Sequence, residues 1–198
     1  MTPNRSYEPI TMADLDRLRQ IAVSARQGFF SRKPKCLALR GRVICVALCQ
    51  GAALHFVDGR NGIKDFDIWT FYAGLPSVRY PARAIQNRDF GDPKFGSDPY
   101  NPGYVGRRID LIGRSLGVEV GADPVQALQH YLKDGRTASA RLLAQKAVVL
   151  LEPEDLLGTI VWTREEAPAS RNLNSQSFEE AKAATFRQYD AAMSELQK

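Results

Sequence analysis

The chain has 198 residues, of which 44% are hydrophobic and 25% are charged, so it can form a sizeable core without disulfides. No stretch reaches the roughly 18 apolar residues of a membrane span, and the N-terminus lacks the apolar region of a signal peptide. We therefore expect a cytoplasmic protein with no membrane partner. The net charge of +5 favours polyanionic partners such as nucleotides or RNA, and it serves solubility equally well.

The first half of the chain predicts two helices and two strands. Thr11, with Asp14 three residues later, forms a near capping box before apolar residues at helical spacing. The apolar run that contains Cys45 and Cys49 has the length of a strand, and we interpret both cysteines as buried thiols in a reducing compartment. The predicted elements are a helix over 11–27, a strand over 43–49, a short helix over 50–56, a turn over 58–62 and a second strand over 63–73.

The second half predicts one strand and several helices after a long loop. Proline, glycine and aspartate crowd residues 74–103 too densely for a regular element, and a loop of this length is often functional. Asp123 and Pro124 suit the N-cap and the first position of a helix. The predicted elements are a strand over 105–114, helices over 124–133, 137–151 and 154–162, and a final helix from Ser177.

These elements predict an α/β (α+β) fold. We expect a small mixed β-sheet that carries three aspartates, with helices packed on one side of it and a helical C-terminal part. The expected division is a first domain over residues 1–118 and a helical C-terminal region over residues 119–198.

Two carboxylates stand two residues apart in the second predicted strand. Asp65 and Asp67 lie among aromatic and β-branched residues. Alternation along a strand directs both side chains to one face, with Cβ atoms roughly 6–7 Å apart. Like charges at this spacing repel each other and lose solvation, so the pair predicts a bound cation. Mg²⁺ is the hard, oxygen-seeking candidate.

This pair belongs to a longer pattern. A glycine turn and short helix, Gln50-Gly51-Ala52-Ala53, precede it, and a later apolar strand carries one carboxylate in Ile109-Asp110-Leu111. In this order the features resemble the nucleotidyltransferase superfamily related to DNA polymerase β, over about residues 40–115.

The resemblance implies transfer of a nucleoside monophosphate from a nucleoside triphosphate to an acceptor, with RNA and protein as candidates. Asp65, Asp67 and Asp110 would be the ligands of Mg²⁺ or Mn²⁺. Asp110 would also deprotonate the acceptor hydroxyl. Two ions held in this way stabilise the attacking and leaving oxygens together.

The same resemblance assigns phosphate contacts to the glycine turn and to neighbouring cations. Gly51 and Ala52 would offer backbone N–H groups to a phosphate. Lys64 and Arg108 would bring positive charge to it. Both cations could instead have a purely structural role. Lys64 could simply lie at a strand edge, and Arg108 could pair with the acidic cluster.

Ala52 and Ala53 depart from the pattern of active members, which commonly carry a serine at one of these positions. The alternative function is therefore a catalytically inactive nucleotidyltransferase-like binding module, an antitoxin or a subunit with a protein partner. A third hypothesis is an RNA-binding protein that uses the aromatic and basic residues of segment 79–108. Those aromatics could instead attach the loop to the body of the domain.

Three further polar residues have ordinary structural interpretations. Lys146 could extend from an apolar helix to the surface, and its alternative role is contact with a triphosphate. We interpret His55 and His130 as structural histidines in their predicted helices.

Overall fold

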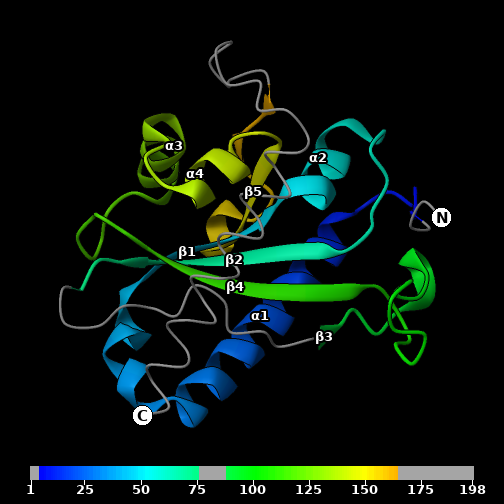
Figure 1. Ribbon diagram of the computed structural model, residues 1–198, viewed down its shortest axis with the longest axis horizontal. Helices are drawn as coiled ribbons and strands as arrows, with labels where there is room; N and C mark the ends of the chain where they lie inside the picture. Colours follow the sequence, from blue (N-terminus) through cyan, green and yellow to red (C-terminus); the bar gives the residue numbers. More distant parts are fainter. Residues whose placement is uncertain (1–4, 76–87, 165–198) are drawn as a thin grey trace.

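Most apolar runs of the sequence become strands of one six-stranded mixed sheet (Figure 1). The computed structural model describes residues 5–75 and 88–164. In chain order the strands are β1 (Val43–Cys49), β2 (Phe66–Ala73), β3 (Arg88–Asp89), β4 (Arg108–Leu116), β5 (Ala147–Glu152) and β6 (Ile160–Trp162). Their order across the sheet is β3-β4-β2-β1-β5-β6, in which β2 and β4 are parallel and the other neighbours are antiparallel. The predicted α/β class with a mixed sheet is confirmed.

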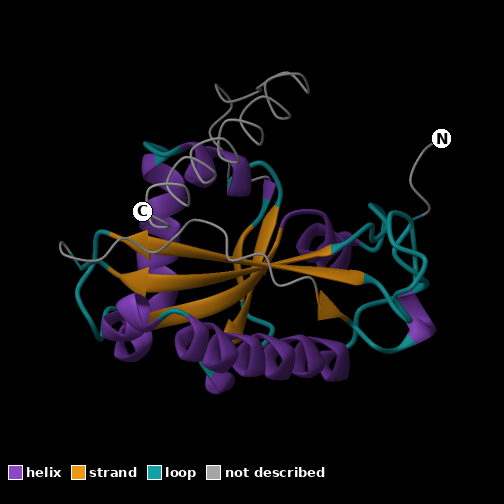
Figure 2. Ribbon diagram, turned by 60° about the horizontal axis from the view of Figure 1, so that its bottom comes forward, coloured by secondary structure: helices purple, strands orange, loops and turns teal. Residues whose placement is uncertain are grey.

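Helices cover both faces of this sheet (Figure 2). The α-helices are α1 (Met12–Arg32), α2 (Gln50–Asp58), α3 (Pro124–Asp134) and α4 (Ala138–Leu143), and the 3-10 helices are η1 (Pro34–Arg42), η2 (Pro93–Phe95) and η3 (Glu154–Leu156). Leu18 of α1 shares a buried cluster with Ile68 of β2, whereas Leu128 of α3 shares another with Trp69. The expectation of helices on one side is therefore wrong, because β2 buries apolar side chains on both of its faces.

The capping box predicted at the start of α1 is present. The Asp14 N–H donates to the Thr11 hydroxyl at 3.3 Å, and the Thr11 N–H donates to the Asp14 carboxylate at 2.7 Å. α1 continues to Arg32, past the predicted end at residue 27, because Phe29 and Phe30 are buried against η1. Within the described ranges, no helix has both the length and the apolar character needed to cross a bilayer.

The predicted helix over 137–151 is wrong in its second half. α4 ends at Leu143, and the apolar residues 147–151 enter the sheet as part of β5, between β1 and β6. A short apolar run does not distinguish a buried strand from a buried helix by its periodicity, and paired valines favour the strand. The predicted helix over 154–162 likewise divides into η3 and β6. The helix predicted from Ser177 lies outside the described residues.

The described part of the long loop is attached to the sheet. The rings of Phe90 and Phe95 lie 5.4 and 5.2 Å from that of Phe66 in β2. The buried Arg107 donates its Nε–H to the Phe95 carbonyl oxygen at 2.9 Å. The interpretation that aromatic residues attach this loop to the body is thus confirmed for Phe90 and Phe95, whereas Tyr80 lies outside the described residues.

Candidate functional site

The three predicted aspartates come together at one end of the sheet. Because β1 is antiparallel to β2 and β2 is parallel to β4, the end of β1 lies beside the starts of β2 and β4. Cys49 pairs with Asp67, and Asp67 pairs with Asp110, in one row across three strands. Residues paired in this way share a face of the sheet, which here is the face covered by α3 and α4. Asp65 directly precedes β2, and we call Asp65, Asp67 and Asp110 the carboxylate cluster.

Arg108 joins two members of the carboxylate cluster. Its Nη2 lies 3.3 Å from Asp65 Oδ2 and 3.4 Å from Asp110 Oδ2, and its Nε lies 3.4 Å from Asp110 Oδ1. Asp110 is only 6% exposed, so its negative charge needs a partner inside the protein. Of the two interpretations of Arg108, the ion pair is the one observed.

The electrostatic surroundings of Arg108 are mostly negative. Burial alone lowers the pKa of its guanidinium, but nearby carboxylates outweigh burial and raise the pKa above its ordinary value. In order of decreasing effect, these carboxylates belong to Asp110, Asp65, Asp98 and Asp67. Arg108 is therefore the central cation of a group of four acidic residues.

Arg107 is the second cation of this region. Burial lowers the pKa of its guanidinium, and attraction by Asp98 and Asp65 offsets burial only in part. Asp98 and Asp65 therefore act on both guanidinium groups of this region.

The turn from β1 into α2 lies beside the cluster. Gln50 has a φ of +61°, which is rare outside glycine, and it directs the chain from β1 into α2 with no intervening loop. A Cβ atom at Gly51 would lie 3.9 Å from the Lys146 Nζ, so the ammonium group reaches this turn. Lys146 belongs to the connection between α4 and β5, not to the predicted helix. The start of α2 thus combines backbone N–H groups that have no partner within the helix with a nearby positive charge.

The two alanines after Gly51 face the core. Ala52 and Ala53 are buried in the cluster that contains α1, so their methyl groups pack against apolar side chains. Any ligand contact of Ala52 is therefore confined to its backbone. A serine at either position would bring a hydroxyl to a place where apolar contacts are made.

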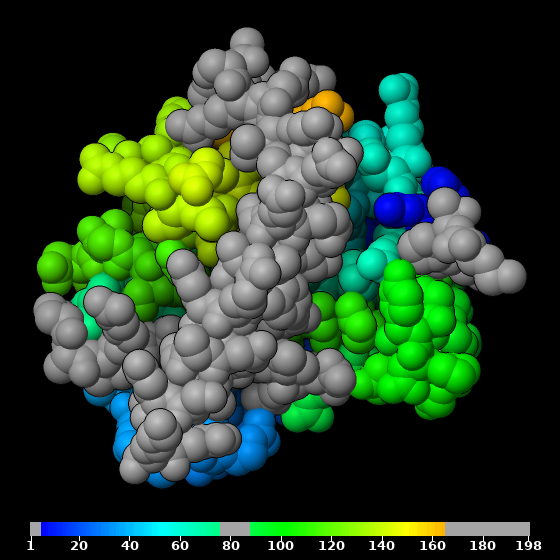
Figure 3. Space-filling view, in the orientation of Figure 1, coloured from blue at the N-terminus to red at the C-terminus, as the bar shows by residue number. Residues whose placement is uncertain are grey.

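Lys64 lies at the rim of the site. Its Nζ is 4.9 Å from the ring centroid of Tyr100, which is 61% exposed. The segment between β3 and β4 (green) and the residues that lead from α2 into β2 (teal) lie at the same edge of the molecule (Figure 3). An exposed aromatic ring and an ammonium group therefore stand next to the carboxylate cluster.

The fit of the site to a metal ion depends on Arg108. Across residues 5–75 and 88–164, no group of three or more histidine, cysteine, aspartate or glutamate side chains is arranged to hold an ion. Arg108 supplies the positive charge between Asp65 and Asp110 instead. Carboxylate oxygens are nevertheless the ligands that Mg²⁺ prefers. In the described residues the cluster is therefore arranged around a guanidinium and not around a metal ion.

Sequence reasoning missed Asp98 and Gln50. Asp98 is 3% exposed, and its charge acts on both arginines. In the sequence it stands before a proline in a breaker-rich loop, where an aspartate signals only a turn. Nothing in the sequence marked the sharp turn at Gln50, because a positive φ is not expected of glutamine.

The structural interpretation of His55 and of the strand cysteines is confirmed. His55 is buried, and its Nε2 lies 3.0 Å from the Glu8 carbonyl oxygen. Cys45 and Cys49 are buried in β1, and burial raises the pKa of both thiols well above its ordinary value. These thiols therefore stay neutral and are poor nucleophiles.

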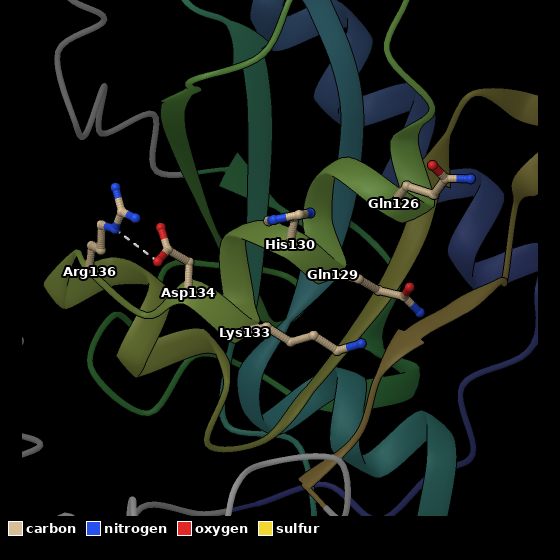
Figure 4. A pocket seen from close by; sticks show the side chains of 6 residues that line it. All are labelled: Gln126, Gln129, His130, Lys133, Asp134 and Arg136. Carbon is tan, nitrogen blue, oxygen red and sulfur yellow. Dashed lines mark ion pairs between the residues drawn. The ribbon is translucent and has the colours of Figure 1, made fainter.

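A separate pocket of about 600 Å³ lies along α3 (Figure 4). It is lined by Gln126, Gln129, His130, Lys133, Asp134 and Arg136. His130 is exposed there, so it is not a core histidine. Asp134 pairs with Arg136 at 2.9 Å, and no member of the carboxylate cluster lines the pocket. This pocket therefore has no part in the candidate site.

Comparisons of the chain with protein-family models, with curated proteins and with solved structures gave no match. The function has to be argued from the residues of the site.

Proposed function

We propose that the chain is a cytoplasmic, Mg²⁺-dependent nucleotidyltransferase that moves a nucleoside monophosphate from a nucleoside triphosphate to an acceptor. The observation that carries this proposal is the direct pairing of Asp67 with Asp110 across β2 and β4, beside the turn at Gly51. Carboxylates paired on adjacent strands can share divalent cations. Mn²⁺ suits the same ligands.

Each group near the turn has its own part in this reaction. Asp65, Asp67 and Asp110 would hold the cation, which would supply charge stabilisation for the phosphates and the departing pyrophosphate. The oxygen of the acceptor hydroxyl attacks the α-phosphorus. As it does so, the Asp110 carboxylate takes up the proton of that hydroxyl. Backbone N–H groups from Gly51 onward and the Lys146 ammonium bind the outer phosphates.

RNA and protein are the candidate acceptors. The exposed Tyr100, with the Lys64 ammonium near its ring, supports an acceptor that carries nucleobases, because bases stack on accessible aromatic rings. A protein acceptor would use the same hydroxyl chemistry without this stacking.

The alternative is a nucleotidyltransferase-like binding module without catalysis, such as an antitoxin or a partner subunit. Two observations favour it. Ala52 and Ala53 are buried with no hydroxyl to offer, and Arg108 already forms ion pairs with two of the three carboxylates. This alternative predicts no transfer with any nucleotide and a stable complex with another protein.

The test is transfer of an α-³²P-labelled nucleotide by the wild-type chain and by Asp67→Asn. Each of the four nucleoside triphosphates is supplied with Mg²⁺ or Mn²⁺, with RNA and protein fractions as acceptors. We expect Asp67→Asn to lose at least about a hundredfold in transfer rate, since even outer-shell partners of a metal ligand cost 10–100-fold. Asp16→Asn is the matched control, because Asp16 lies on α1 and pairs with Arg19 at 2.7 Å, away from the cluster.

Two results would contradict the proposal. Full transfer by a folded Asp67→Asn protein would remove the cluster from the reaction. Absence of transfer by the wild type with every nucleotide, together with recovery of a stable protein complex, would favour the binding module.

A further inference from the structure

We propose that the exposed cations at the end of α1 and along η1 form a surface that binds the phosphate backbone of RNA. The surface consists of Arg32, Lys33, Lys35 and Arg40, and we call it the basic surface. It lies away from the carboxylate cluster and takes no part in the nucleotide chemistry. Only the choice of RNA as the polyanion rests on the proposed function, in which RNA is a candidate acceptor.

The excess positive charge of the chain is concentrated in one stretch of its sequence. Between Asp16 and Asp58 there is no aspartate or glutamate, whereas eight arginine and lysine residues occur there. This local excess is larger than the net charge of +5 of the whole chain. Cations without acidic neighbours in the sequence produce a positive potential that attracts polyanions.

The structure divides these eight cations into two groups. Four of them contact carboxylates or carbonyl oxygens, namely Arg17, Arg19, Arg26 and Arg42. The other four are those of the basic surface, and all of them are exposed. Within residues 5–75 and 88–164, none of these four has an ion pair or a side-chain hydrogen bond. Their charges are therefore available to a partner.

The backbone beneath the basic surface is held in place. Cys36 and Leu39 of η1 are buried in one cluster with Phe29 of α1 and Tyr72 of β2. The Lys33 N–H donates to the Phe29 carbonyl oxygen at 2.9 Å, which joins η1 to the end of α1. Side chains three residues apart lie above one another in a 3-10 helix, so the residues between the two buried positions face solvent. The cations thus extend from a rigid support, which lowers the entropy cost of binding.

The spacing of the cations suits a row of phosphates. Lys35 and Arg40 both lie in η1. At roughly 2.0 Å per residue, their backbones are about 10 Å apart along the helix. Phosphates of one nucleic-acid strand follow each other at about 3.4 Å along the axis of a duplex. Several phosphates can therefore contact the basic surface at once.

The composition of the surface favours contact with nucleic-acid phosphates over contact with lipid or with bases. Among residues 26–42, Leu37 is the only large apolar side chain that is exposed, and binding to a bilayer needs a broader apolar face. Phe29 and Phe30 are the only aromatic residues of this range, and both are buried. No ring is available there for stacking, so we expect RNA to bind without base preference.

The basic surface and the carboxylate cluster lie toward opposite ends of β2 (Figure 1). Arg42, at the end of η1, donates to the Gly74 carbonyl oxygen at 2.5 Å, just past the end of β2. Asp67 lies near the start of β2, about 20 Å away at roughly 3.3 Å per residue. Substitutions in the basic surface therefore leave the carboxylates untouched.

The test is binding of fluorescein-labelled oligouridylate to the full chain, measured by fluorescence anisotropy at a series of KCl concentrations. Lys35→Gln combined with Arg40→Gln removes two exposed cations and no contact of the fold. At about 0.1 M KCl we expect this double variant to bind at least about tenfold more weakly, because each lost phosphate contact lowers the salt slope of single-strand binding by about 0.7. Oligoadenylate of equal length should show the same loss.

Lys133→Gln combined with Arg136→Gln is the matched control. Both residues are exposed near the end of α3, and the two double variants change the same residue types and remove the same charge. The control should alter RNA affinity by less than about twofold, since charges distant from the bound strand are screened by salt. A loss equal to that of the basic-surface variant would mean that RNA responds only to the overall charge, and would overturn the proposal.

A second measurement uses the wild-type chain alone. Lysine acetylation is followed by mass spectrometry with and without oligouridylate. RNA should lower the acetylation rates of Lys33 and Lys35 and leave the rate of Lys133 unchanged. Equal rates with and without RNA at Lys33 and Lys35 would overturn the proposal.

The outcomes separate this inference from the proposed function, because binding is measured without a nucleoside triphosphate. No RNA binding by the wild type at about 50 mM KCl overturns the inference and leaves transfer to a protein acceptor intact. The expected binding without any nucleotide transfer supports the inference and contradicts the transferase. Tighter binding to phosphatidylserine vesicles than to RNA, lost in the basic-surface variant, would identify a lipid surface as the partner and overturn the inference.

Discussion

Gln50 is the residue at which the chain accepts local strain to build the site. In the described part of the chain it is the only residue other than glycine with a positive φ, and its side chain is buried. Its bridge to Ala147 also links the end of β1 to the start of β5. A left-handed conformation costs about 1–2 kcal/mol for a residue with a Cβ atom. The sharp turn places the start of α2 beside Asp67, so the strain has a structural consequence at the candidate site.

The backbone conformation of Gln50 predicts an unusual order of stability. We expect Gln50→Gly to be more stable than Gln50→Ala by about 1 kcal/mol in urea unfolding, because only glycine adopts this φ without cost. Gln20 is the control, since it is exposed within α1. There the order should reverse by about 1 kcal/mol, because alanine is the better helix former. The same order at both positions would contradict the left-handed turn.

The sequence correctly predicted those side-chain contacts that follow from the geometry of a strand. Alternation placed Arg108 and Asp110 on one face of β4, and the two residues do form an ion pair. Asp67 and Asp110 became direct neighbours through the parallel pairing of β2 and β4, which the sequence alone did not specify. Asp98 reached the region through the Phe95–Arg107 contact, and no local pattern encodes that contact.

At the scale of elements, Asp14 links the start of α1 to the loop that carries η2. Its Oδ2 accepts the Thr11 N–H at 2.7 Å and the Lys94 ammonium at 2.6 Å. Burial raises the pKa of this carboxyl, but the hydrogen bonds from Lys94 and Thr11 lower it below its ordinary value. The folded state therefore binds this proton more weakly than the unfolded state. The stabilisation is complete above about pH 4 and is lost as the pH falls through the folded-state pKa.

We expect Asp14→Asn to lower the free energy of unfolding by about 1–2 kcal/mol at pH 7, through loss of charge-assisted hydrogen bonds. Urea unfolding should show the gap from wild type closing as the pH falls below about 4, where the wild-type carboxyl also becomes neutral. Asp16→Asn on the same helix should change stability by less than about 0.5 kcal/mol, since exposed ion pairs contribute little. A gap for Asp14→Asn that is constant with pH would contradict the assignment.

Prediction of elements depended on whether local signals and tertiary context agreed. The boundaries of β1 matched the predicted strand, and Gly135 ends α3 in a left-handed conformation as expected after a helix. The residues of β5 read equally well as a buried helix. Their strand state comes from pairing with β1 and β6, which is non-local information.

At the scale of the whole molecule, the sheet joins the two halves of the chain. β1 lies between β2, from the first half, and β5, from the second. α3 and α4 also cover the face on which Asp67 lies, through the cluster that contains Trp69 and Phe71. The rigid end of the sheet that carries the carboxylate cluster is therefore built by residues on both sides of the predicted boundary at residue 118.

This arrangement predicts that a fragment of residues 1–118 does not fold alone. Without β5 the edge of β1 is unpaired, and the apolar face of β2 loses its cover, so we expect no cooperative transition in urea from the fragment.

In the full chain, Leu150→Ala should lower the free energy of unfolding by about 2–5 kcal/mol as a buried core truncation, whereas Ile160→Ala, at an exposed position of β6, should lower it by less than about 1 kcal/mol. A cooperative transition from the fragment would mean that the first 118 residues form an independent domain. In that case the charge and geometry of the candidate site would not depend on the second half of the chain.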